Sequence, residues 1–257
     1  MATFIPCRRC ANKPGPKSGF YYVTYPGTQQ KGVVECECHK QFVIQETLQH
    51  RAIDANVWPE AFSYNIDTEY TGTRSLKDVQ RLKKYVYEFP NFKSSVVYMY
   101  GPNGTQKTTL AHWIGANVLH QGYSVKYLLM QSLLMTISGF ERDESKQAEK
   151  QAEIEKLANT DLLIIDESFS KDKVTLYESG YQLPFLDRFL RERVEIKKKG
   201  IVFISNKPPS EIERQKFSAS IQNFIERNTV KPNGACLLFE DNYMQSKTDF
   251  DPGSLFD

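Results

Sequence analysis

The sequence predicts an α/β fold, in which helices flank a parallel β-sheet and a small metal-binding module precedes the sheet. Three observations support this prediction. Short apolar runs alternate with helical stretches from Ser94 onward, a glycine-containing loop follows the first of these runs, and four cysteines fall within the first forty residues. Alternating strands and helices are typical of a parallel sheet, because each parallel connection needs a crossover segment, usually a helix.

Five apolar runs are the expected strands. Each is short and is followed by a polar or loop-forming segment, as buried strands are. Leucine and valine recur at helical spacing over residues 74–88, and residues 41–51 show a weaker helical pattern. Residues 141–156 carry many charges of both signs and predict an exposed helix. The expected strands are Val96–Tyr100, Ser124–Met130, Leu162–Ile165, Ile201–Ser205 and Cys236–Phe239.

Length and composition limit the possible organisation. A chain of 257 residues suits one main domain and a small accessory module, because single cores seldom grow beyond about 250 to 300 residues. We expect the module at residues 1–45, a connector and helix at 46–92, and the α/β domain at 93–257. The net charge of +2 gives no bulk attraction for nucleic acid. No apolar stretch approaches the roughly 20 residues of a membrane span, and residues 1–6 lack the pattern of a secretory signal, so we expect a cytoplasmic protein with no membrane partner.

The loop after the first expected strand has the composition of a phosphate-binding loop. Its backbone N–H groups and the start of the next helix would face phosphate oxygens, Lys107 would neutralise the β- and γ-phosphates, and Thr108 would coordinate Mg²⁺. Gln106 departs from the pattern, because glycine is expected there, and its side chain would crowd the loop or alter its conformation. A turn that carries a lysine by chance is the alternative. The residues expected to bind ATP here are Gly101, Asn103, Gly104, Thr105, Gln106, Lys107, Thr108 and Thr109.

Two further strand ends carry polar side chains. Asp166 and Glu167 follow the apolar run Leu162–Ile165, at the end of a strand where ligands of open α/β sheets bind. Asp166 would join Thr108 in holding Mg²⁺, and Glu167 would polarise the attacking water. Asn206 ends the next strand and would position that water or the γ-phosphate. A turn-forming asparagine is the alternative for this residue.

The order of these motifs resembles that of AAA+ helicase loaders of the DnaC and DnaI kind and of the related IstB-like transposition helper ATPases. The resemblance covers about residues 92–243 and departs from the family at Gln106. It implies an AAA+ P-loop NTPase domain that lacks a helical lid and forms an ATP-dependent homo-oligomer. It also implies that Arg227, in the run Asn223–Arg227, reaches into the ATP site of a neighbouring subunit. A surface arginine is the alternative.

The amino-terminal cysteines predict a zinc site. Cys7 and Cys10 have the two-residue spacing of a zinc knuckle, and Cys36 and Cys38 supply a second pair. In a reducing compartment such pairs favour a metal over disulfides, and four soft ligands suit tetrahedral Zn²⁺. His39 is a competing ligand in place of Cys38. Unliganded thiols are the alternative, although a module of this size without a metal has too little core to fold.

The resemblance leaves three functions open. The first is an ATP-dependent loader that holds a hexameric replicative DNA helicase through the zinc module and contacts single-stranded DNA through the ATPase domain. Loaders of the DnaI kind carry such a module, whereas IstB-like helpers generally do not. The second is a nucleotide-binding adaptor or inhibitor without appreciable hydrolysis, which Gln106 would explain, and the third is a transposition helper ATPase. Arg142, Lys146 and Lys150 are candidates for DNA contact, with a solvated helix face as the alternative.

Overall fold

The chain forms two compact units, Met1–Ile53 and Asp54–Asp257. The computed structural model describes residues 5–13, 15–26, 29–70, 76–92, 95–139, 143–230 and 235–239. The expected absence of a helical lid concerns residues after 239, which lie outside the described part of the chain. No helix in the described ranges is long and apolar enough to cross a membrane.

The amino-terminal unit is a β-hairpin that is preceded by one helix and followed by another along the chain. Strands β1 (Phe20–Thr24) and β2 (Lys31–Glu35) pair antiparallel, α1 spans Arg8–Ala11, and α2 spans Glu37–Ala55. The buried residues at the centre of the unit are Cys10, Tyr21 and Cys36. Two of these three residues are cysteines, at positions that apolar side chains fill in an ordinary core.

The larger unit is built on a five-stranded sheet with the strand order β4-β5-β6-β3-β7, in which every neighbouring pair is parallel. The central strands are apolar and buried, as expected for strands covered on both faces. The apolar runs expected from the sequence form these strands to within one residue at each end, which confirms the predicted fold class. The strands are β3 (Val96–Tyr100), β4 (Val125–Leu129), β5 (Leu162–Asp166), β6 (Gly200–Ser205) and β7 (Ala235–Leu238).

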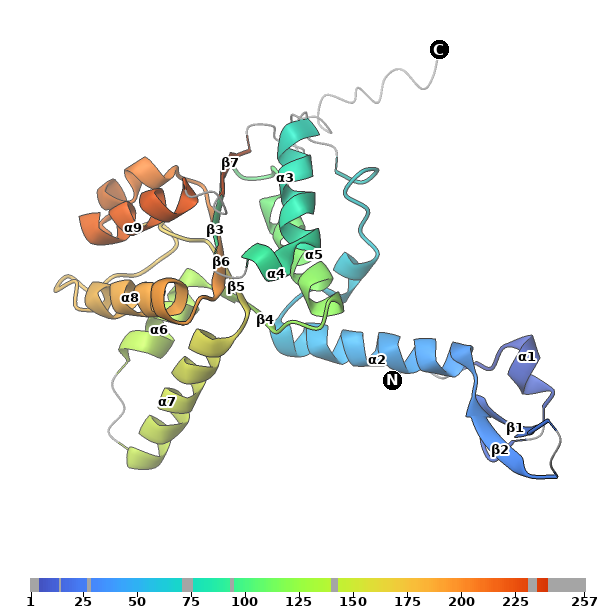
Figure 1. Cartoon of the computed structure of the whole chain (residues 1–257). Coiled ribbons are helices and arrows are strands. Elements are labelled where there is room, and N and C mark those ends of the chain that lie inside the picture. The colour runs from blue at the N-terminus through green and yellow to red at the C-terminus, as the bar shows by residue number, and fades with distance from the viewer. Residues whose placement is uncertain are drawn as a thin grey trace, which may run out of the picture. The chain divides into compact units, whose positions relative to one another are not determined.

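Helices cover both faces of this sheet, which Figure 1 shows nearly edge-on: α3, α4 and α5 lie on one side, and α6, α7, α8 and α9 on the other. The charge-dense segment forms the exposed helix α7, as expected. The helices are α3 (Leu76–Tyr87), α4 (Phe89–Phe92), α5 (Lys107–His120), α6 (Met130–Ser138), α7 (Glu144–Asn159), α8 (Gln182–Arg191), the π-helix η2 (Glu192–Ile196) and α9 (Ala219–Thr229), with short 3-10 turns η1 (Pro59–Phe62), η3 (Pro209–Glu211) and η4 (Glu213–Gln215).

The strand order brings three functional segments to one edge of the sheet. Because β6 lies between β3 and β5, the loop after β3, the acidic pair after β5 and Asn206 after β6 emerge side by side. Residues 54–66, expected to belong to a connector, are part of the larger unit. Val57, Ala61 and Ile66 are buried, and η1 packs on α5.

Candidate nucleotide-binding site

The loop between β3 and α5 depends on unusual backbone conformations. Gly101 has φ +143°, and a Cβ atom at this position would lie 1.8 Å from the carbonyl oxygen of Phe239, so only glycine fits. Gln106 precedes α5 with φ 59° and ψ 16°, in the left-handed region. This conformation explains why glycine is expected at position 106, because a residue with a Cβ atom pays about 1 to 2 kcal/mol to adopt it.

Lys107 folds back onto the loop. Its Nζ donates hydrogen bonds to the carbonyl oxygens of Gly101 (2.9 Å) and Pro102 (2.6 Å) and to Oγ1 of Thr105 (3.0 Å). Burial lowers the pKa of Lys107 to about 8, and the nearby Asp166 carboxylate opposes this shift. At neutral pH the ammonium group is therefore charged, within the loop expected to hold phosphates.

Asp166 accepts hydrogen bonds from three directions. Its Oδ2 accepts from the hydroxyls of Thr108 (2.9 Å) and Tyr127 (2.5 Å), and its Oδ1 accepts from the backbone N–H of Glu167 (2.6 Å). The structure thus brings together the two residues expected to hold Mg²⁺. Their carboxylate and hydroxyl oxygens are ligands of the kind that Mg²⁺ takes.

Glu167 and Asn206 border the same space. Oε1 of Glu167 lies 3.2 Å from Nζ of Lys173, and the two side chains are half-exposed. Nδ2 of Asn206 donates to Oδ1 of Asn103 at 2.9 Å, which ties the end of β6 to the phosphate-binding loop. Lys173 was not expected from the sequence. It adds a second cation to the site, beside the carboxylate expected to polarise water.

A cavity of about 370 Å³ lies between the loop and the strand ends. Glu167, Asn206 and every residue expected to bind ATP except Gly101 line this cavity. Its size falls within the usual range for small-molecule sites, and its lining offers backbone N–H groups, hydroxyls and ammonium groups to an anionic ligand. The remaining lining residues, which the sequence did not indicate, are Ser170, Lys173, Ile204 and Ser205.

A stack of aromatic rings leads away from Asp166. The ring of Tyr127 stacks on His112 with centroids 4.3 Å apart, and His112 stacks on Trp58 with centroids 3.9 Å apart. Nδ1 of His112 accepts a hydrogen bond from the backbone N–H of Trp58 at 3.2 Å. Burial lowers the pKa of His112 to about 4, although Asp166 opposes the shift, so this ring is neutral at pH 7. No sequence pattern predicts this stack, because its residues come from three distant segments.

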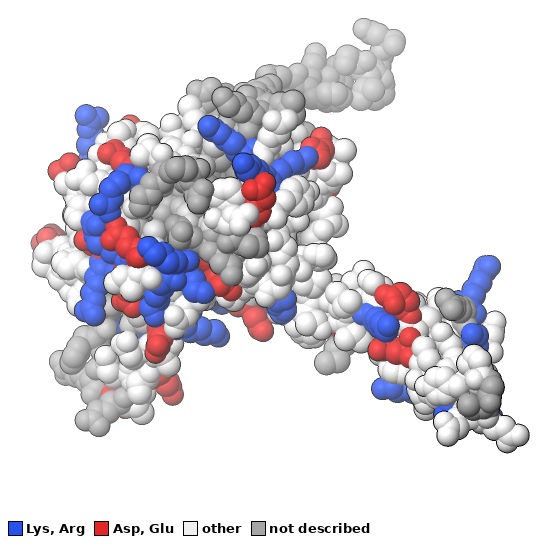
Figure 2. Space-filling model, viewed as in Figure 1, with Lys and Arg blue, Asp and Glu red and all other residues white. Residues whose placement is uncertain are grey.

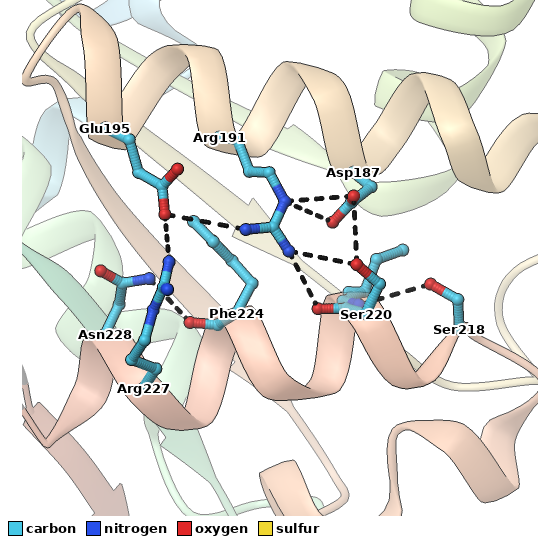
Figure 3. A network of polar contacts seen from close by, with 9 residues as sticks. Asp187, Arg191, Glu195, Ser218, Ser220, Phe224, Arg227 and Asn228 are labelled. Carbon is cyan, nitrogen blue, oxygen red and sulfur yellow. Dashed lines mark hydrogen bonds and ion pairs between the residues drawn. The ribbon is translucent and has the colours of Figure 1, made fainter.

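Arg227 lies outside the cavity, in a charged network between α8 and α9 (Figure 3). Its guanidinium pairs with Glu195, and a carboxylate oxygen of Glu195 also lies 3.8 Å from Nη1 of Arg191. Arg191 in turn donates through Nε to both oxygens of Asp187 at 3.1 Å and through Nη2 to Oγ of Ser220 at 3.1 Å. The structure therefore does not bring Arg227 to the cavity of its own chain. With its side chain 58% exposed, Arg227 faces solvent at the end of this network.

The four amino-terminal cysteines form one cluster whose sulfur atoms all lie within 4.8 Å of one another. Tetrahedral Zn²⁺, with Zn–S bonds of about 2.3 Å, sets its sulfur ligands about 3.8 Å apart, so this cluster fits a zinc ion. His39 lies outside the cluster, and its Nδ1 is 2.6 Å from Oε1 of Glu35. Three of the Sγ–Sγ distances are 3.8 Å for Cys7–Cys10, 3.8 Å for Cys7–Cys36 and 3.5 Å for Cys10–Cys38.

The candidates for DNA contact lie on or beside α7. Arg142 is outside the described residues. Nζ of Lys150 donates to the carbonyl oxygen of Gly139 at 2.6 Å, so this lysine holds the end of α6. Lys146 is exposed. On the face drawn in Figure 2, acidic side chains are interspersed with basic ones, which fits the small net charge of the chain.

Comparisons with known proteins agree with this fold. The sequence model of the IstB-like ATP binding proteins matches residues 45–214, whereas no curated protein matches the sequence. One similar structure is AMPPCP-bound DnaA from Aquifex aeolicus, with 18% identity and a TM-score of 0.55 over 75% of this chain and 54% of that chain. The DnaC helicase loader has 13% identity and a TM-score of 0.52, over 70% of this chain and 98% of that chain. DnaI has 17% identity and a TM-score of 0.50, over 71% of this chain and 91% of that chain.

At such low identity these structures show a shared fold only, and the chain spans about half the length of the first replication-initiation proteins that it matches. The shared fold is a parallel sheet with flanking helices, which is the fold predicted from the sequence for an AAA+ P-loop domain. The match to the sequence model is more specific, because it extends over most of the chain and includes the phosphate-binding loop and the acidic pair after β5. The chain therefore belongs to the IstB-like ATP binding protein family.

Proposed function

We propose that this protein is an ATP-driven loader of a hexameric replicative DNA helicase. One observation carries the proposal, namely that a four-cysteine cluster precedes an ATPase domain of the IstB-like family. By the resemblance noted in the sequence, loaders of the DnaI kind carry an amino-terminal zinc module and transposition helpers generally do not. A solved structure with the same fold is that of the DnaC helicase loader.

In this proposal each part of the chain has its own task. Residues 1–45 bind Zn²⁺ and dock the helicase, residues 46–92 connect this module to the site, and residues 93–257 bind ATP and single-stranded DNA. Lys107 neutralises the phosphates, and Thr108 and Asp166 hold Mg²⁺. Glu167 and Asn206 position the attacking water. The hydrogen bond between Thr108 and Asp166 supports this assignment, because it sets two metal ligands side by side before the metal binds.

Arg227 acts on a neighbouring copy of the chain in this proposal. To do so it leaves Glu195 and pairs with the γ-phosphate of the neighbour's ATP. An exposed ion pair contributes only about 0 to 1 kcal/mol, so the loss of the contact with Glu195 is a small obstacle to assembly. The exposed position of Arg227 on α9 supports a contact between subunits.

Nucleotide binding and turnover test the ATP site. Lys107→Ala should abolish binding of a labelled ATP analogue, because backbone dipoles alone do not replace the ammonium charge. Glu167→Gln should keep binding and stop hydrolysis, because it keeps the shape of the side chain but removes the carboxylate. Lys171→Ala, which changes an exposed lysine that does not line the cavity, is the matched control and should behave as the wild type. Unchanged affinity in Lys107→Ala would refute the site.

Complex formation tests the partner. The wild type should form a complex of defined mass with a hexameric replicative helicase, and single-stranded DNA should change its rate of hydrolysis. A stable complex without turnover under any condition would instead support the adaptor or inhibitor, the alternative that the glutamine at position 106 leaves open. Failure to bind any hexameric helicase, together with binding to a transposase, would support the transposition helper.

A further inference from the structure

We infer that Tyr127 is a positioning residue for the magnesium-binding carboxylate of Asp166, and that the stacked rings of Tyr127, His112 and Trp58 tie the connector to that carboxylate. The inference rests on the proposed nucleotide function of the cavity, and it adds a route by which the connector affects that function.

The contact between Tyr127 and Asp166 is direct. The Tyr127 hydroxyl and the Thr108 hydroxyl donate to the same carboxylate oxygen, Oδ2, at 2.5 and 2.9 Å. An ordinary tyrosine hydroxyl is protonated at neutral pH, so Tyr127 is the donor and the carboxylate the acceptor in this contact. Asp166 is itself only 7% exposed, which limits its access to water as a substitute donor. Partners that orient a metal ligand in this way commonly change metal affinity by about 10- to 100-fold when they are removed.

The Tyr127 ring is itself held by the segment at the end of α2. His112, which separates the Tyr127 ring from Trp58, is only 1% exposed, so the middle ring of the stack is enclosed by protein. The same segment is also tied to the strand that carries Tyr127. Nδ2 of Asn56 donates to the Tyr127 carbonyl oxygen at 3.1 Å, and Nζ of Lys126 donates to the Asp54 carbonyl oxygen at 2.7 Å.

Two hydrogen bonds from side chains to backbone carbonyl oxygens and one stack of rings therefore connect Asp54–Trp58 to Tyr127 and its neighbour Lys126. This segment consists of the last two residues of α2 and the three residues that follow it, and α2 itself begins at Glu37, between two of the clustered cysteines. A partner that shifts Asp54–Trp58 would move the Tyr127 hydroxyl relative to Asp166. The Mg²⁺ requirement for ATP binding would then change without any contact between that partner and the cavity.

The test uses the full chain and measures binding of a fluorescent ATP analogue over a range of Mg²⁺ concentrations and in excess EDTA. Tyr127→Phe keeps the ring and its stack and removes only the hydroxyl. We expect the half-saturating Mg²⁺ concentration to rise about tenfold or more, with metal-free binding unchanged. Tyr123→Phe removes a hydroxyl from a half-buried tyrosine that packs on Phe89, and it should leave the Mg²⁺ requirement unchanged.

The connector is tested at Trp58. Trp58→Ala removes the outer ring of the stack and should raise the half-saturating Mg²⁺ concentration at least about twofold, the low end of energetic coupling through packed side chains. Trp58→Phe, which restores a ring, should return this concentration toward the wild-type value. A purely structural role would not produce this pattern, because it would weaken metal-free binding as well.

The outcomes separate this inference from the proposed function. Wild-type binding with an unchanged Mg²⁺ requirement in Tyr127→Phe would overturn the inference alone. Loss of metal-free binding in Tyr127→Phe would also overturn it, since the hydroxyl would then serve the whole site. Absence of nucleotide binding by the wild type would overturn both the inference and the proposed function.

Discussion

Among single residues, Gln106 is the clearest departure from the pattern of a phosphate-binding loop. It adopts the left-handed backbone that the pattern normally assigns to glycine. The loop around it is held in place, because Gly101 packs against Phe239 at one end and Lys107 bonds three loop oxygens at the other. These contacts hold the loop on both sides of the strained residue.

Gln106→Gly should stabilise the loop without changing its shape. We expect the affinity for an ATP analogue to stay the same or to rise, and the free energy of unfolding to change by no more than about 1 kcal/mol, because the relief of strain is partly offset by a more flexible unfolded chain. Isothermal titration and denaturant unfolding measure the two quantities. Gln106→Ala, which keeps the strain and removes the amide, is the matched control. A fall in affinity in both variants would show that the glutamine side chain itself contacts nucleotide.

Some residues of the site could be predicted from the sequence, and others could not. Lys107 and Thr108 lie in one local motif, and Asp166 and Glu167 end an apolar strand, so chemistry and spacing identify them. Tyr127 is different, because it contacts Asp166 only through the pairing of β4 with β5. The sequence predicted both strands but contained no information on their order in the sheet. That order decides which side chains of neighbouring strands meet.

At the scale of elements, the segment from α8 into η2 holds the amino-terminal ends of the strands, which lie at the opposite end of the sheet from the nucleotide cavity. Leu186, Leu190 and Val194 face the core at helical spacing, and Arg193 falls on the same buried stripe with 0% exposure. Its guanidinium donates to the carbonyl oxygens of four residues where α7 ends and β6 begins. These residues are Leu157 (2.5 Å), Ala158 (3.2 Å), Thr160 (2.6 Å) and Gly200 (2.9 Å).

Arg193→Met should destabilise the larger unit by about 3 kcal/mol or more, because it leaves several buried carbonyl groups without a donor. Nucleotide affinity should change little, since these contacts lie at the opposite ends of the strands from the cavity. Denaturant unfolding gives the stability. Arg188→Met, an exposed arginine on the same helix, is the control and should change stability by less than about 0.5 kcal/mol. Equal stability of the two variants would contradict the role assigned to Arg193.

The strands were more predictable than this helical segment for a physical reason. Uninterrupted apolar runs such as Leu162–Ile165 have few alternatives to a buried strand, and the structure confirms all five. Arg193, by contrast, is buried because backbone carbonyl groups elsewhere in the chain accept hydrogen bonds from its Nη1 and Nη2 atoms. In a sequence, an arginine normally indicates an exposed position on a helix, so the sequence alone does not predict that Arg193 is buried.

At the scale of the whole molecule, the two units are stabilised in different ways. The larger unit has an extensive apolar core on the α8–α9 side of its sheet. The amino-terminal unit has a small core in which cysteines are prominent, and burial and the neighbouring thiols raise the pKa of Cys10 to about 12. Four thiols in such a cluster ionise together only if a cation compensates their charge, so a bound metal and the folded hairpin should depend on each other.

Removal of the metal should therefore unfold the amino-terminal unit alone, because Zn²⁺ supplies on the order of 10 kcal/mol to modules of this kind. Cys7→Ser and Cys38→Ser should lose bound zinc and helicase capture yet keep ATP affinity, since the nucleotide cavity belongs to Asp54–Asp257. Cys236→Ser, which changes an exposed thiol in β7, should retain all three properties. Helicase capture without zinc would place the partner on the larger unit, and loss of ATP binding would show that the units do not fold independently.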